Sequence, residues 1–266
     1  MKIRLLSVYA LIYLAFLYVP VLFLPIFSFN DSAIVAFPLK GLTTQWYEAL
    51  WGNAAMHGAL WNSLKVGVAT AVISTILGIC GARALTRYRF RGQTGIATLI
   101  MLPLVLPEII VAVSLLVVLL QLGFSLSLVS VTLGHILMAV PFSIAVLSSS
   151  FEGFDRSLEE ASLDLGEGAA ATFFRVTLPI VAPGILSSLL ITFTISLDEF
   201  IVAFFLSGTE PTLPVYIWSQ LRFTARLPNV LALGSILLLA SFLLLWAAEI
   251  LRRRAARRAG GSGSIL

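Results

Sequence analysis

Charged side chains are scarce in this sequence. Asp, Glu, Lys and Arg make up 11% of its 266 residues, whereas 59% are hydrophobic. A soluble domain carries charge on roughly a quarter of its residues, so this composition excludes an ordinary soluble protein. The mean hydropathy of +1.01 agrees with this and indicates a chain that crosses a membrane several times.

Cysteine and histidine are almost missing as well. The chain has one cysteine, Cys80, and two histidines, His57 and His135, which lie far apart in the sequence. A disulfide framework needs pairs of cysteines, and a metal site needs clustered thiol and imidazole ligands. The sequence therefore predicts neither a disulfide nor a metal site.

The motifs of common catalytic sites are also missing. The chain has no Gly-x-x-x-x-Gly-Lys-Ser/Thr phosphate loop, no His-Glu-x-x-His pair and no Gly-x-Ser-x-Gly elbow. We therefore expect no catalytic residue, no enzymatic activity and no cofactor bound by this chain. The formal charge of +4 comes from basic residues at the ends of apolar segments rather than from one patch, which argues against nucleic acid as a partner.

Long apolar runs, by contrast, are plentiful. Runs of about 18 residues or more indicate membrane spans. Six segments qualify, at about residues 5–29, 60–85, 95–122, 126–149, 183–206 and 230–251. They predict an all-α, multi-pass membrane protein with a single transmembrane domain over residues 1–266. Residues 252–266 are expected to form a basic, flexible tail that is attracted to membrane lipid.

The distribution of Lys and Arg predicts the orientation of these spans. All but four of the 17 basic residues fall before the first span, after the last one, in the second and fourth connections, or, for Arg83, at the end of the span that leads into the second connection. The four exceptions are Lys40, Lys65, Arg222 and Arg226. Because connections on the cytoplasmic side are enriched in Lys and Arg, we expect both termini to be cytoplasmic.

One polar segment interrupts the apolar sequence. Residues 159–179 read EEASLDLGEGAAATFFRVTLP. Leu158, Ala161 and Leu165 recur at helical spacing, and Gly166 can end a helix in the left-handed conformation that suits glycine. A second short helix can follow at 168–174, giving a helical hairpin on the cytoplasmic side. This hairpin either lies on the bilayer or fits a groove on a cytosolic partner.

The same segment carries a resemblance to a known family. Glu160-Ala161-Ser162, three residues, Gly166, nine residues and then a Val-Thr-Leu-Pro run resemble the EAA motif of ABC-importer permease subunits. Ser162 replaces the usual second alanine and Val176 the usual isoleucine, and the spacing is kept. The shorter runs LPEIIVAVSLL, GHI and SLDEFIVAFF are similar to the second permease subunit of spermidine/putrescine-type systems.

The resemblance implies a bacterial inner-membrane protein with a type I, MetI-like permease fold. It implies a second permease subunit, making a heterodimer, two ATPase subunits that bind ATP and Mg²⁺, and a periplasmic binding protein as partners. It also implies that residues 157–179 form a coupling segment that docks on the ATPase. The coupling residues it implies are Glu160, Ala161, Leu163, Asp164, Leu165, Gly166, Glu167, Gly168, Leu178 and Pro179.

Three acids within the predicted spans are candidates for a solute pathway. Glu108 follows Pro107 in the third span, where Pro103 and Pro107 are expected to break the helix. Asp198 and Glu199 lie within the fifth span. Since an acid at the bilayer centre costs a few kcal/mol, each should face protein or water. Each either lines a pathway for a cationic solute or forms hydrogen bonds between spans.

Three functions are compatible with these features. The resemblance favours a non-catalytic permease subunit of an ABC importer for a small solute, with polyamines first and amino-acid-like solutes such as 4-aminobutyrate or opines as alternatives. A stand-alone secondary transporter would work without an ATPase. An intramembrane enzyme is disfavoured because catalytic motifs are missing.

Overall fold

The computed structural model describes residues 2–260, and within them the regular structure is helical apart from one isolated bridge between Asn30 and Leu42. Five helices are long and apolar enough to cross a membrane, and a bent pair of helices makes a sixth candidate span. This agrees with the six spans predicted from hydropathy. The chain folds as two compact units, residues 1–54 with 217–266 and residues 55–216.

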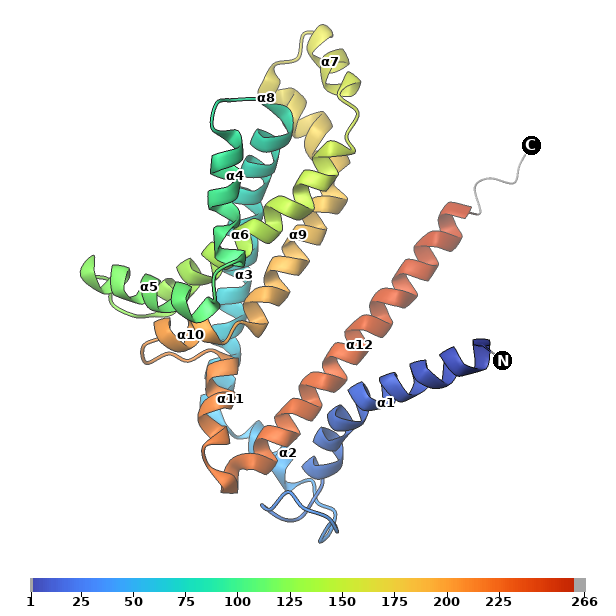
Figure 1. The fold of residues 1–266 in the computed structure, drawn as a ribbon, viewed down its shortest axis with the longest axis vertical. Coiled ribbons are helices and arrows are strands. Elements are labelled where there is room, and N and C mark those ends of the chain that lie inside the picture. Colours follow the sequence, from blue (N-terminus) through green and yellow to red (C-terminus); the bar gives the residue numbers. More distant parts are fainter. Residues whose placement is uncertain (1, 261–266) are drawn as a thin grey trace. The chain divides into compact units, whose positions relative to one another are not determined.

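The first unit is built around two long helices, α1 (Lys2–Ser28) and α12 (Leu227–Gly260), which pack against each other. Gly234 lies at their contact, where an added Cβ would lie 3.6 Å from the Leu24 side chain, an ordinary van der Waals distance. The two helices diverge away from this end (Figure 1). The short helix α2 (Gln45–Trp51) is tied to α1 by a hydrogen bond of 2.6 Å between the Ser28 and Tyr47 hydroxyls.

Helix α12 differs from its prediction at its end. The helix continues to Gly260, whereas the sequence predicted a flexible tail from residue 252. The reason is that Arg and Ala, which fill residues 252–259, are strong helix formers. Residues 261–266, the rest of the predicted tail, lie outside the described residues.

The second unit is a bundle centred on three long helices, α3 (Ala54–Arg87), α6 (Leu128–Glu152) and α9 (Leu178–Asp198). Small residues let them approach closely. A Cβ added to Gly78 on α3 would collide with the Ser143 side chain on α6, and one added to Gly184 on α9 would collide with Ser150. Close approach through small residues is typical of helix packing in membranes.

Buried hydroxyl groups line the contact between these three helices. The Ser188 hydroxyl on α9 forms hydrogen bonds with Thr75 of α3 at 3.0 Å and with Ser143 of α6 at 2.7 Å. Nearer the end of α9, Nδ1 of the buried His135 lies 2.8 Å from the Ser196 hydroxyl. Polar groups away from water are stable only when they find such partners, so these bonds select one arrangement of the helices.

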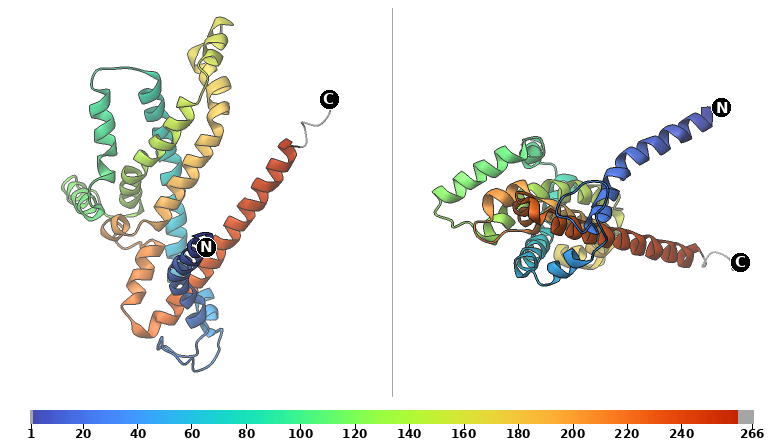
Figure 2. Two further views of the ribbon diagram at one scale, coloured as in Figure 1. Left: turned by 45° about the vertical axis from the view of Figure 1, so that its right-hand side comes forward. Right: turned by 90° about the horizontal axis from the view of Figure 1, so that it is seen from below.

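The predicted third span is broken, as its prolines indicated. Helix α4 (Gln93–Met101) continues into a 3₁₀ turn, η1 (Leu102–Leu104), and α5 (Glu108–Gln121) then leaves at 102° (Figures 1 and 2). Proline cannot donate a helical hydrogen bond and clashes with the preceding turn. The prediction that Pro103 and Pro107 break this helix is confirmed.

The predicted fifth span is broken too, and the sequence did not predict this break. Helix α9 ends at Asp198, Glu199 is extended, and α10 (Ile201–Leu206) follows and packs on α5 and α6. The chain then runs through α11 (Leu213–Leu221) and a 3₁₀ turn, η3 (Thr224–Arg226), to α12.

Candidate functional site

A helical hairpin connects α6 to α9. Its first arm is α7 (Ser157–Asp164), where the Asp155 carboxylate accepts a hydrogen bond of 3.0 Å from the Ser157 amide. This bond lowers the pKa of Asp155, because it stabilises the charged form. At the other end Gly166 has φ +89°, and the Glu167 amide donates to the Ser162 carbonyl at 3.2 Å. These features make a Schellman turn, so the prediction that Gly166 ends the helix in the left-handed conformation is confirmed.

The second arm differs from its prediction. Helix α8 (Ala169–Thr172) begins as expected but does not end near residue 174. A π-helical turn, η2 (Phe173–Thr177), carries it directly into α9, so that residues 169–198 form one 30-residue helix. A hydrogen bond between the Ser162 and Thr172 hydroxyls, at 3.0 Å, joins the two arms. The arm that returns to the membrane is therefore an extension of α9.

Helix α7 and the turn after it present apolar side chains to the surroundings. Leu165 is 87% exposed, and Leu158 and Leu163 are each 44% exposed. Leu165 and Gly166 make the turn itself, directly after the eight-residue α7. Exposed apolar side chains grouped in this way indicate a surface that binds another protein. Of the predicted coupling residues, Glu160, Ala161, Asp164 and Gly168 are exposed in the same segment, whereas Glu167 and Leu178 are partly buried.

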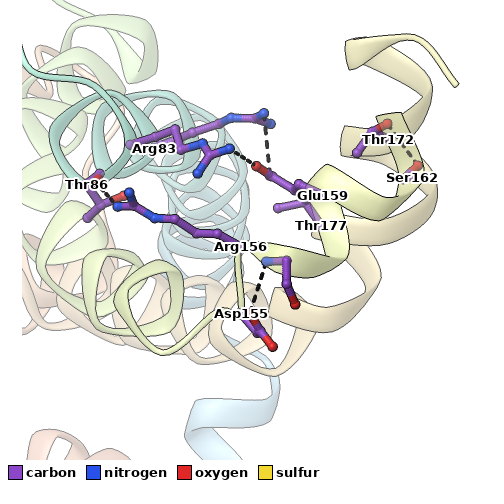
Figure 3. A network of polar contacts seen from close by, with 10 residues as sticks. Arg83, Thr86, Asp155, Arg156, Glu159, Ser162, Thr172 and Thr177 are labelled. Carbon is purple, nitrogen blue, oxygen red and sulfur yellow. Dashed lines mark hydrogen bonds and ion pairs between the residues drawn. The ribbon is translucent and has the colours of Figure 1, made fainter. Parts of the chain in front are cut away.

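Glu159, which the sequence analysis did not select, is the buried residue of α7. Its exposure is 6%. One carboxylate oxygen lies 3.0 Å from Arg87 Nη2, and the other lies 3.7 Å from Arg83 Nη2 and accepts a 2.7 Å hydrogen bond from the Thr177 hydroxyl. The carboxylate therefore joins α7 to the end of α3 and to η2 (Figure 3).

Two further contacts strengthen this junction. Arg156, just before α7, donates a 3.0 Å hydrogen bond to the Thr86 carbonyl on α3 (Figure 3). The Arg83 guanidinium lies over the Phe173 ring, 4.3 Å from its centre, where the negative face of the ring attracts it. The end of α3 therefore contacts both arms of the hairpin.

The three candidate pathway acids lie at helix ends. Glu108 is the first residue of α5 and is exposed, and Asp198 is the exposed last residue of α9. Glu199 lies in the extended link, where its carboxylate accepts a 3.0 Å hydrogen bond from the Val202 amide and caps α10. The expected position of Asp198 and Glu199 inside a continuous fifth span is therefore wrong, whereas Glu108 follows the break that was predicted in the third span.

The packing of α10 on α5 brings two of these acids together. Glu108 lies close enough to Glu199 for their charges to interact. Both residues lie at breaks in the predicted spans: Glu108 is in the first turn of α5, and Glu199 lies just before α10. Negative charge at a helix N-terminus is favourable, so part of the cost of placing these acids in an apolar environment is offset locally.

Comparison with known proteins finds a matching family and similar permease proteins. A family model described as "Binding-protein-dependent transport system inner membrane component" matches residues 74–257. The chain is 37% identical over 231 residues to the putrescine transport system permease protein PotI of Escherichia coli strain K12, covering 84% of this chain and 82% of that protein. It is 32% identical over 252 residues to the spermidine/putrescine transport system permease protein PotC of the same strain, covering 94% of each.

Solved structures share the fold at lower identity. A chain of a bacterial ABC transporter involved in the import of the acidic polysaccharide alginate matches with a TM-score of 0.73 and 16% identity, covering 92% of this chain and 95% of that one. A chain of the MetNI methionine ABC transporter in an inward-facing conformation matches with a TM-score of 0.59 and 18% identity, covering 78% of this chain and 97% of that one.

Proposed function

Because the chain belongs to the family of binding-protein-dependent transport system inner membrane components, we propose that it forms half of the translocation pathway of a polyamine importer. It is a multi-pass inner-membrane permease subunit of an ABC importer and has the type I importer fold, as the sequence predicted. Spermidine and putrescine are the proposed solutes, because two relatives that match most of the chain are named as permeases for them.

The proposed partners are a second permease subunit, two ATPase subunits and a periplasmic binding protein. This chain is a non-catalytic membrane component, and its sequence has no phosphate loop. ATP and Mg²⁺ are therefore assigned to the ATPase partners. In this arrangement the α7 hairpin is cytoplasmic and inserts into a groove on the ATPase.

One observation carries the coupling role. Leu165 is 87% exposed at a turn that is fixed by Gly166, between the motif positions Glu160 and Pro179. An apolar side chain held rigidly at the tip of a helical hairpin suits insertion into a groove. When ATP binding closes the ATPase dimer, a docked hairpin would move with it. The spans attached to the hairpin would then change the side to which the pathway opens.

The solute pathway is proposed to pass the acids Glu108, Asp198 and Glu199. All three lie in the second unit at ends of α5, α9 and α10, where the predicted spans are interrupted. A polyamine carries several ammonium groups, and carboxylates in a desolvated site attract cations far more strongly than they do in water. Interrupted helices whose ends contact the solute are a recurring feature of transporters.

The docking proposal can be tested on a surface residue. Leu165→Ser should weaken binding of the ATPase by about 2 kcal/mol, or about thirtyfold, because truncating a buried apolar anchor has that effect at protein interfaces. Leu42→Ser is the matched control, since Leu42 is 81% exposed in the loop between α1 and α2. The measurements are co-purification with the ATPase and ATP-dependent uptake of labelled putrescine. Equal co-purification and uptake of the two variants would contradict the docking surface.

A further inference from the structure

The Glu159 carboxylate has a different environment from the other acids of the hairpin. Arg83 and Arg87 approach it from α3, and the Thr177 hydroxyl approaches it from η2. The two arginine side chains are about a quarter exposed, at 24% and 27%, while the glutamate side chain is 7% exposed. A buried carboxylate is tolerated only when it is paired and hydrogen-bonded, and Glu159 has both kinds of partner.

Apart from the hydrogen bond between Ser162 and Thr172, which joins α7 to the second arm, the side chains of α7 make few buried contacts. Among its eight residues, all described, Glu159 is the buried one. A helix this short is not stable alone, because the free-energy cost of nucleating it exceeds the stabilisation from two turns of backbone hydrogen bonds. Its apolar residues Leu158 and Leu163 are on the surface rather than packed on α3. The position of α7 relative to α3 therefore depends on the ionic contact of Glu159 and on the bond from Arg156 to Thr86.

We infer that Glu159 is a positioning residue that transmits displacement of α7 to α3 through Arg83 and Arg87. This inference rests on the proposed function, because it gives the docked hairpin its mechanical connection to the transmembrane bundle. The adjacent Glu160 is exposed and belongs to the docking surface. In this proposal Glu160 contacts the ATPase, and the neighbouring Glu159 contacts α3.

The ion pairs of Glu159 with Arg83 and Arg87 are strong enough to transmit a movement of α7 to α3. A charged pair with low exposure is costly to separate, since each partner would be left without its counter-charge. Arg83 also lies over Phe173 in η2, and Thr177 in η2 donates to the same carboxylate. Helix α3, α7 and the start of the helix that continues into α9 are therefore joined at one point. A movement applied to α7 reaches two long helices of the bundle.

The test is to remove the charge of Glu159 while keeping its shape. In the complete importer in proteoliposomes, with its ATPase and binding protein, Glu159→Gln should lower the labelled putrescine imported per ATP hydrolysed about tenfold, within the range of site-to-site coupling energies. ATPase co-purification should stay normal, because the tip of the hairpin is unchanged. Glu152→Gln is the matched control, since Glu152 is an exposed glutamate at the end of α6.

A second measurement does not depend on transport. Spin labels at Tyr88→Cys, after α3, and Asp164→Cys, on α7, in a Cys80→Ser background report the distance between these elements. Glu159→Gln should broaden the distance distribution, and Arg87→Gln, which removes a partly exposed partner, should broaden it as well. Distributions and transport ratios equal to those of Glu152→Gln would overturn the inference. A wild-type importer that takes up no putrescine would instead contradict the proposed substrate, and the spin-label result would still decide the role of Glu159.

Discussion

Glu159 and Glu160 are adjacent in sequence and differ in environment. Successive residues of a helix point about 100° apart, so one carboxylate can face α3 while the next faces the surroundings. The motif drew attention to Glu160 because its spacing to Gly166 is recognisable in the sequence. The burial of Glu159 depends on Arg83 and Arg87, which come from a distant part of the chain. Spacing along one helix cannot reveal such a partner.

Gly166 is a residue whose conformation the sequence did predict. Its φ of +89° costs a residue with a Cβ about 1–2 kcal/mol, while the space around it is open. Gly166→Ala should therefore raise amide hydrogen exchange in residues 161–167 about fivefold, which corresponds to about 1 kcal/mol. Mass spectrometry of the purified complex measures this exchange.

The matched control is at the same position. Gly166→Asn should show a smaller increase, since asparagine enters the left-handed conformation more readily than alanine does. Because no neighbouring atom lies within 4 Å of the added Cβ, a steric clash cannot explain a difference between the two variants. Exchange in Gly166→Ala equal to that of the wild type would show that the hairpin turn does not need a left-handed residue.

At the scale of the helices, hydropathy predicted which segments are long and apolar enough to cross a membrane. It did not by itself predict that the helices of the third and fifth segments are broken. The break before α5 was predictable because Pro103 and Pro107 remove backbone donors. The break after Asp198 was not, since neither proline nor glycine marks it and the apolar sequence continues to Leu206. Glu199 caps α10 through the Val202 amide, which is a local bond that hydropathy does not report. Hydropathy also did not predict that α8 continues through η2 into α9.

The contact between α3 and α6 leads to a prediction about one glycine. A Cβ at Gly78 would lie 2.8 Å from the Cβ of Ser143 and closer still to its hydroxyl, which bonds Ser188. Gly78→Ala should therefore destabilise the bundle by about 1–3 kcal/mol, as overpacking does. Thermal unfolding in detergent should show a lower Tm. The control, Gly58→Ala, is on the same helix with no atom within 4 Å of the added Cβ, and its better helix propensity should leave Tm equal or higher. Equal Tm values for both variants would contradict close packing at Gly78.

At the scale of the whole chain, composition alone predicted the class, because scarce charge and long apolar runs leave few alternatives to a bundle of membrane helices. The family followed from one spaced motif, whereas the positions of the candidate pathway acids depend on the fold. Glu108 and Glu199 are far apart in sequence and are brought together by the packing of α10 on α5. The division of the chain into two units also depends on contacts between its two ends, α1 and α12, and no local pattern encodes these contacts.

The orientation in the membrane is the whole-molecule property that the charges predict most directly. Since Lys and Arg are retained on the cytoplasmic side, the loop between α1 and α2 should face the periplasm and the α7 hairpin the cytoplasm. Ala36 and Ala170 are exposed in these two segments, so Ala36→Cys and Ala170→Cys in a Cys80→Ser background make a matched pair. An impermeant maleimide should label Ala36→Cys in intact spheroplasts and label Ala170→Cys only after permeabilisation. Labelling of Ala170→Cys in intact spheroplasts would place the hairpin outside, where no ATPase could bind it, and would contradict the coupling role together with the orientation.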